Sequence, residues 1–272
     1  MTRTIRAAIL ILALSFAGCS GGANDPTQQA SSEPPVSTPP DQTATPATTG
    51  DFDTAVKYTK LAHTDMYNEA AELVVPESPA DRYVVHQTLY RRAVKASQGY
   101  APEDVPPEFE PDPAKGSIKI IFLAEAETQQ EARENATSYT WKDFTYEGGR
   151  IAGWTGKSGP VEDVLWTRTT HAQSRGRRAE LKSAYLSDIG SLIAVVELWS
   201  SEPSKFWEGE YTARGGYRQA ASEYGARDLS EGEKTLGYYV FEDAKFGGVL
   251  RIPHTDGDGT GQGDWKLKLA IK

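Results

Sequence analysis

The chain has 272 residues, 38% of them hydrophobic and 10% aromatic, with six Trp and thirteen Tyr. This composition is typical of a folded protein, and the length suits two domains of roughly 100 to 120 residues beside some non-globular sequence. The formal net charge is −9, with no basic stripe, so nucleic acid is not expected as a partner. The single cysteine, Cys19, excludes internal disulfides, zinc sites built on several thiolates and a cysteine nucleophile in the folded body.

The chain begins with the pattern of an export signal. Two arginines precede an apolar run, 7–16, that is too short to span a bilayer, and small residues follow it. Phe16-Ala17-Gly18-Cys19 resembles the bacterial lipobox, usually Leu-(Ala/Ser)-(Gly/Ala)-Cys, with Phe in place of Leu. The resemblance implies a signal peptide over 1–18 and acyl chains on Cys19 that anchor the protein to the outer face of the cell membrane. The alternative is an ordinary secretory signal with an incidental cysteine.

A tether is expected after the anchor. Residues 19–50 are almost entirely Ser, Thr, Pro, Gly, Gln and Ala, with no aromatic residue. Such a segment buries too little apolar surface to offset the entropy of ordering, so we expect a disordered spacer stiffened by proline.

Two helices are expected at the start of the first domain, 51–175. Apolar residues recur at mixed three and four spacing from Val56 to Leu73, and Pro76 ends that helix. Ser78-Pro79-Ala80-Asp81 then has the form of a helix N-terminus, with the second helix running to Gly99.

Strands are expected in the rest of this domain, after a Pro-rich connection over 102–113. Residues 117–126 alternate like a half-buried strand, and 137–156 read as two strands around Gly148-Gly149, a hairpin signal. Residues 161–173 suggest one further strand. Two helices followed by a curved antiparallel sheet make an α+β domain.

This order of elements, with the segment LAHTDMYNEAAELVVPESPADRYVVHQ, resembles the NTF2-like cone fold, in which helices cover a bent sheet around a pocket. In enzymes of that superfamily an Asp, a His and a Tyr inside the cone transfer protons, which makes His63, Asp65, Tyr67 and His86 the candidates here. His63 and Tyr67 are four positions apart and are expected to share a helix face. The alternative is that all four are surface or structural residues.

The second domain, 176–272, is expected to be a β-sandwich. Strand-like runs recur, and Leu192 to Leu198 and Trp265 to Ile271 alternate with the period of strands that bury one face. The one helix-like pattern lies at 215–226. The spacing of these runs, with Gly232-Glu233 as an exposed turn and Phe241 as an inward side chain, resembles the immunoglobulin-like modules of bacterial surface lipoproteins.

Two local features suggest binding. Asp256-Gly257-Asp258-Gly259-Thr260-Gly261 resembles the opening of a calcium loop, with Asp264 as a further oxygen donor, but Leu267 occupies the position of the bidentate Glu. A hairpin turn needs the same Gly and Asp residues. Trp207, in a loop-like segment, is the tryptophan expected to be exposed on a binding surface, whereas the others suit core packing.

The leading hypothesis is a lipid-anchored binding or scaffolding lipoprotein, with an extracellular protein, cell-wall or small-molecule partner and no cofactor, resembling bacterial surface lipoproteins of the actinobacterial type. The alternative is an extracellular enzyme that uses His, Asp and Tyr in the first domain. No Gly-x-Ser-x-Gly, HExxH, Walker or GxGxxG motif occurs in the sequence. A transporter's solute-binding lipoprotein is disfavoured because βαβ alternation is absent.

Overall fold

The computed structural model describes residues 49–98, 106–225, 228–256 and 266–271, and residues 46–272 form one compact unit. The signal, Cys19 and nearly all of the expected tether lie outside the described residues. The helices are α1 (Thr49–Ala62), α2 (Tyr67–Ala71), α3 (Pro79–Gln98), α4 (Gln129–Glu134) and α5 (Val161–Val164). None of the helices in the described part of the chain combines the length and apolarity that crossing a membrane would require.

The expected first helix is broken, which corrects the sequence interpretation. α1 ends at Ala62 and α2 begins at Tyr67. Between them the backbone of Asp65 takes a positive φ of 60°, a left-handed conformation that stops a helix, and the His63 ring bonds the carbonyl of Thr59. His63 and Tyr67 therefore do not share a face of one helix. The second helix is confirmed as α3.

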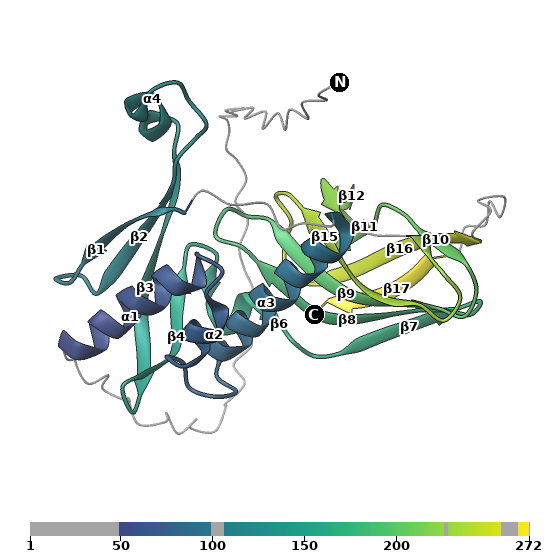
Figure 1. The fold of residues 1–272 in the computed structure, drawn as a ribbon, viewed down its shortest axis with the longest axis horizontal. Coiled ribbons are helices and arrows are strands. Elements are labelled where there is room, and N and C mark those ends of the chain that lie inside the picture. Colours follow the sequence, from purple (N-terminus) through teal and green to yellow (C-terminus); the bar gives the residue numbers. More distant parts are fainter. Residues whose placement is uncertain (1–48, 99–105, 226–227, 257–265, 272) are drawn as a thin grey trace, which may run out of the picture. The chain divides into compact units, whose positions relative to one another are not determined.

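The first sheet is antiparallel, in the order β1-β2-β3-β4-β5 (Figure 1). Its strands are β1 (Glu108–Asp112), β2 (Ser117–Phe122), β3 (Thr137–Glu147), β4 (Arg150–Gly156) and β5 (Gly159–Pro160). The hairpin expected at Gly148-Gly149 joins β3 to β4, and both glycines have positive φ. β1 lies inside the segment 102–113, which was expected to be an irregular Pro-rich connection. A strand can form there because β1 is at the edge of the sheet, where a proline such as Pro111 is tolerated.

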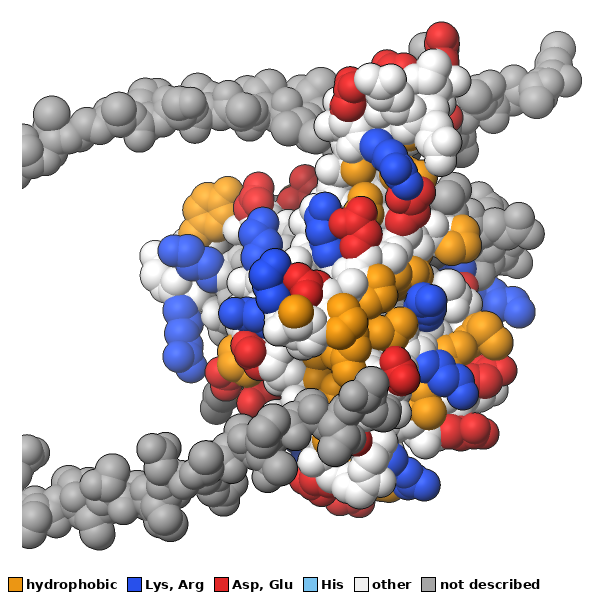
Figure 2. Space-filling model, turned by 90° about the vertical axis from the view of Figure 1, so that its left-hand side faces the viewer, with side chains coloured by type: hydrophobic (Ala, Val, Ile, Leu, Met, Phe, Trp, Pro, Cys, Tyr) orange, Lys and Arg blue, Asp and Glu red, His pale blue; other side chains and the backbone are white. Residues whose placement is uncertain are grey.

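Helices α1 and α3 cover this sheet through an aromatic core. Tyr58 of α1 and Tyr83 of α3 both contact Trp141 of β3 and Trp154 of β4. Figure 2 views the molecule from the side of α1 and this sheet, and hydrophobic side chains gather at the centre of that face between charged ones of both signs.

Two further sheets pack face to face as a β-sandwich. One has the order β12-β11-β16-β10-β14 with β17 on β16, and the other β13-β15-β9-β8-β6 with β7 on β8. The strands are β6 (Leu165–Trp166), β7 (Thr170–Ser174), β8 (Arg177–Leu186), β9 (Leu192–Ser200), β10 (Ser204–Phe206), β11 (Glu210–Ala213), β12 (Arg218–Ala220), β13 (Glu223–Tyr224), β14 (Asp228–Leu229), β15 (Lys234–Phe241), β16 (Gly248–Asp256) and β17 (Lys266–Ile271). Alternate residues of β9 and β17 fill the core between the sheets, as their periodicity predicted.

Two segments form other elements than those expected. Residues 161–173 form the short helix α5 and the strands β6 and β7, rather than one strand. The helix-like pattern at 215–226 includes β12 and β13 instead, because Gly215 and Gly216 have positive φ and turn the chain back onto β11.

Helix α3 belongs to two cores. Near its start, Ala80, Tyr83 and Val84 pack with the first sheet. Near its end, Ala93 and Val94 pack against Val195 of β9 and Tyr238 of β15, and Figure 1 shows the helix running from α2 to β15.

The fold class is thus mixed: helices with an antiparallel sheet, followed by antiparallel sheets packed as a sandwich. Likeness to the NTF2-like cone and to immunoglobulin-like modules stays a prediction. The expected boundary at residues 175 and 176 falls in the turn between β7 and β8, and β6 and β7 on its N-terminal side pair with β8. The division into two domains, 51–175 and 176–272, also stays a prediction.

Candidate functional site

A pocket of about 400 Å³ lies between α1, α2, α3, the first sheet and the loop that joins β8 to β9. We call it the aromatic pocket, because aromatic rings make up much of its wall. The aromatic and aliphatic lining residues are Ala62, Tyr67, Tyr83, Phe122, Tyr139, Tyr185, Ile189 and Ile193. The polar ones are His63, Asp65, Gln87, Thr137, Ser187 and Asp188.

His63 is fixed in the wall by two hydrogen bonds. Its Nδ1 lies 2.7 Å from the carbonyl oxygen of Thr59, so Nδ1 carries the proton and donates. Its Nε2, 2.8 Å from the hydroxyl oxygen of Tyr139, then accepts from that hydroxyl. Burial lowers the pKa of His63 to about 4, against the smaller raising effect of the bond to Thr59, so the ring is neutral at pH 7.

Asp188 is the buried acid of the pocket, with 5% of its surface exposed. Its Oδ2 accepts a hydrogen bond of 2.8 Å from the indole N–H of Trp141, and its Oδ1 accepts one of 3.0 Å from the backbone N–H of Ser158. Burial raises the pKa of Tyr139 and of Tyr185, and the nearby charge of Asp188 raises both further.

The loop that carries Asp188 is held to the first sheet. The hydroxyl of Ser158 donates to the carbonyl of Ser187 at 2.7 Å, and the turn 187–191 closes on itself through two backbone hydrogen bonds of 2.9 Å. At Gly156 the chain passes so close that an added Cβ would lie 2.3 Å from Oδ1 of Asp188. The carboxyl group is therefore held in one position.

The second acid of the pocket, Asp65, is already paired. Its Oδ1 accepts a hydrogen bond of 2.8 Å from the Tyr67 hydroxyl, and its Oδ2 forms an ion pair with Arg91 of α3.

Three of the four candidates named from the sequence, His63, Asp65 and Tyr67, thus line one pocket, while His86 does not. His86 is fully buried on α3, where its Nδ1 lies 2.8 Å from the Ser183 hydroxyl and its Nε2 has no hydrogen-bond partner among the described residues. Burial lowers its pKa to about 3.

Sequence reasoning missed Tyr139, Tyr185 and Asp188. Asp188 stands in Ser-Asp-Ile-Gly, which reads as an exposed turn, and it belongs to the other expected domain. Only the strand periodicity around Tyr139 and Tyr185 could have indicated inward side chains, without saying into which cavity.

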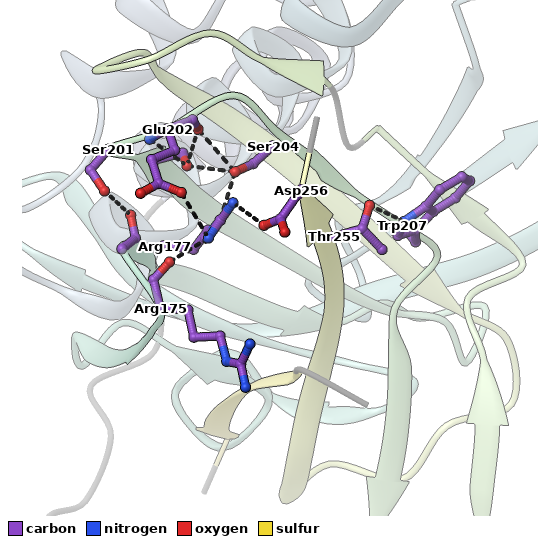
Figure 3. A network of polar contacts seen from close by, with 10 residues as sticks. Arg175, Arg177, Ser201, Glu202, Ser204, Trp207, Thr255 and Asp256 are labelled. Atoms are coloured by element: carbon purple, nitrogen blue, oxygen red, sulfur yellow. Dashed lines mark hydrogen bonds and ion pairs between the residues drawn. The ribbon is translucent and has the colours of Figure 1, made fainter. Parts of the chain in front are cut away.

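The binding features expected near the C-terminus lie elsewhere. Asp256 ends β16, and its Oδ1 accepts a hydrogen bond of 2.6 Å from Arg177, so a calcium ion would have to compete with a guanidinium (Figure 3). Asp258 and Asp264 lie outside the described residues. Within the described ranges no group of three or more His, Cys, Asp or Glu side chains is placed to hold a metal ion.

Trp207 is exposed, as expected, with 39% of its surface accessible. Its indole N–H donates a hydrogen bond of 3.3 Å to the Thr255 hydroxyl (Figure 3). The ammonium group of Lys205 lies over its ring. Trp207, Lys205 and Thr255 do not line the aromatic pocket.

Comparison of this chain with protein-family models, with curated proteins and with solved structures finds no match.

Proposed function

We propose that this protein is a lipid-anchored binding protein on the outer face of a cell membrane, and that it binds a small molecule in the aromatic pocket. The observation that carries the binding half is the pocket itself: about 400 Å³, walled mainly by aromatic and aliphatic side chains with a few fixed polar groups. This composition is the usual one for small-molecule sites. The anchor rests on the lipobox-like sequence that ends at Cys19.

A second pocket is a weaker candidate. It has a volume of about 330 Å³ and is lined by Gln173, Arg178, Glu180, Glu197, Trp199 and Lys234. The charged side chains of this pocket already form ion pairs with one another, Arg178 with Glu180 and Lys234 with Glu197. A ligand there would have to break exposed ion pairs and would gain little apolar contact.

The geometry supports binding better than acid-base catalysis. A histidine with a pKa of about 4 is a weak base, and the Nε2 that would take a proton already accepts from Tyr139. Neither pocket carboxylate is a hydrogen-bond partner of His63, whose ring nitrogens bond Thr59 and Tyr139. Asp65 pairs with Arg91, and Asp188 accepts from Trp141 and Ser158. The pocket therefore has a fixed polar pattern without an arranged proton-transfer pair.

The binding half is tested with a library of small neutral, cationic and anionic fragments, screened against the full-length protein by ligand-observed NMR. Ile189, 55% exposed and lining the pocket, is replaced in Ile189→Trp to fill the pocket. Val85, 48% exposed and outside the pocket lining, gives the matched control Val85→Trp. We expect fragments that bind the wild type and Val85→Trp but lose at least ten-fold in affinity for Ile189→Trp. If no fragment shows this pattern, the proposal fails.

The anchor is tested separately. Mass spectrometry of the membrane-fraction protein is expected to show an acylated N-terminal peptide that begins at Cys19. Cys19→Ala is expected to leave the membrane fraction, and a variant that still sediments with membranes would contradict the anchor.

A further inference from the structure

The aromatic pocket contains a buried carboxyl group without a cationic partner. Asp188 forms no ion pair with any described Lys, Arg or His side chain, and its two protein hydrogen bonds come from the indole of Trp141 and the amide of Ser158. A carboxylate has about four lone-pair sites, so these two donors leave it able to accept more. Burying a negative charge without a cation is costly, and a ligand that brings a positive charge removes that cost.

The other charged groups of the pocket do not supply that cation. The negative charge of Asp65 is balanced by its ion pair with Arg91. His63 is neutral near pH 7, because its Nε2 accepts from Tyr139 while its Nδ1 donates to a carbonyl. The pocket therefore has one negative charge in excess, at Asp188.

Aromatic rings line the same pocket as Asp188. Tyr83 and Tyr185 pack edge to face with centroids 5.1 Å apart, and Phe122 and Tyr139 lie 5.7 Å apart. All four line the pocket together with Tyr67. Ring faces attract cations, most strongly where water is excluded, and a set of rings beside an acid is the arrangement that recognises ammonium groups.

We propose that the ligand of the aromatic pocket carries an ammonium group, which binds beside Asp188 and against the tyrosine rings. This inference rests on the proposed function, since it assumes that the pocket is a binding site. It goes further by stating the ligand's charge and chemical class.

The test compares three probes of nearly equal size and shape, titrated into the full-length wild-type protein by isothermal calorimetry at pH 7. Choline carries the ammonium group, 3,3-dimethylbutan-1-ol is its neutral carbon analogue, and 3,3-dimethylbutanoate is an anion of similar shape. We expect choline to bind at least ten-fold more tightly than the alcohol, with still weaker binding of the anion, and Ile189→Trp to remove choline binding.

Two variants locate the charge. Asp188→Asn is expected to lower the affinity for choline at least ten-fold and to change the affinity for the alcohol by less than about three-fold. Glu197→Gln, which removes a carboxylate outside the aromatic pocket, is expected to leave choline affinity within two-fold. If Asp188→Asn does not fold, the comparison of the three probes on the wild-type protein decides alone.

The outcomes separate the two proposals. If the alcohol binds as tightly as choline, or if choline does not bind while other fragments occupy the pocket, the ammonium inference is overturned and small-molecule binding stands. Choline binding that survives Ile189→Trp also overturns the inference, because the site is then elsewhere. If neither the three probes nor any library fragment depends on Ile189, the proposed function fails as well.

Discussion

The indole N–H of Trp141 donates a hydrogen bond of 2.8 Å to Asp188, which joins strand β3 to the loop between β8 and β9, 47 positions along the chain. Trp141 is fully buried and Asp188 nearly so. The bond therefore fixes the acid of the aromatic pocket from the core side and links two parts of the fold that the sequence suggests are separate.

Trp141→Phe removes this donor and part of the buried ring. Because a hydrogen bond to a charged group contributes about 1.5 to 3 kcal/mol, and a smaller ring leaves unfilled space, we expect the free energy of unfolding to fall by roughly 3 kcal/mol. Urea unfolding followed by circular dichroism measures it. Trp207→Phe, at an exposed position, is the control and is expected to change stability by less than about 0.5 kcal/mol.

Gly156→Ala tests the close packing around Asp188. An added Cβ would lie 2.3 Å from Oδ1, so the side chain of Asp188 or the strand has to move. Gly153→Ala is the control on the same strand, since its Cβ would meet Thr145 Oγ1 at 3.4 Å. We expect the first variant to lower both Tm and affinity for any ligand of the pocket, and the second to affect both much less. Equal effects would mean that the position of Asp188 is not the cause.

The buried His86 is expected to lower the free energy of unfolding in acid. Its pKa is about 3 in the folded protein and about 6.5 in an unfolded chain, so between these values the unfolded state binds more protons and stability falls as the pH falls. At pH 5 this amounts to about 2 kcal/mol relative to pH 7. The double variant His86→Leu with Ser183→Ala removes both members of the buried pair and is expected to shrink the difference by about that amount.

Urea unfolding at pH 7 and pH 5 measures the difference, with His171→Gln as the control at an exposed position. A double variant as acid-sensitive as the wild type would assign the effect to other groups. His63 and His254 act in the same direction, because burial lowers the pKa of each to about 4.

Arg177 is a buried guanidinium that joins the two sheets of the sandwich. It donates to Ser204 at 2.7 Å, to the carbonyl of Arg175 at 2.5 Å and to Asp256 at 2.6 Å, as Figure 3 shows. Arg177→Met leaves these acceptors without their donor, and we expect a loss of about 3 kcal/mol in the free energy of unfolding.

The neighbouring Arg178, half exposed in an ion pair with Glu180, provides the control. Arg178→Met is expected to cost less than about 1 kcal/mol, because exposed pairs contribute little. Similar losses in the two variants, measured by urea unfolding, would contradict a structural role specific to the buried guanidinium.

Local patterns predicted the elements that depend on local chemistry. Pro79 at a helix start, Gly148-Gly149 in a tight turn and the alternation of β9 and β17 all gave the observed structure. The break at His63 was not predictable, because it depends on a side chain that bonds the carbonyl of Thr59 and on a left-handed Asp65.

The site was predictable only in part for the same reason. His63, Asp65 and Tyr67 are close in sequence, so reasoning along the chain could name them together. Asp188 and Tyr185 reach the pocket through tertiary packing between segments more than 100 residues apart, and a polar turn gives no signal that it will be buried.

The most direct test of the central claim is the ¹H–¹⁵N spectrum of the full-length protein titrated with the fragments found in the binding screen. We expect the indole N–H signal of Trp141 and the backbone amides of Tyr139, Asp188 and Ile189 to shift with ligand concentration, while the indole signals of Trp199 and Trp207 stay in place. Shifts confined to Trp199 or Trp207, with Trp141 and Asp188 unmoved, would contradict the assignment of the aromatic pocket as the binding site.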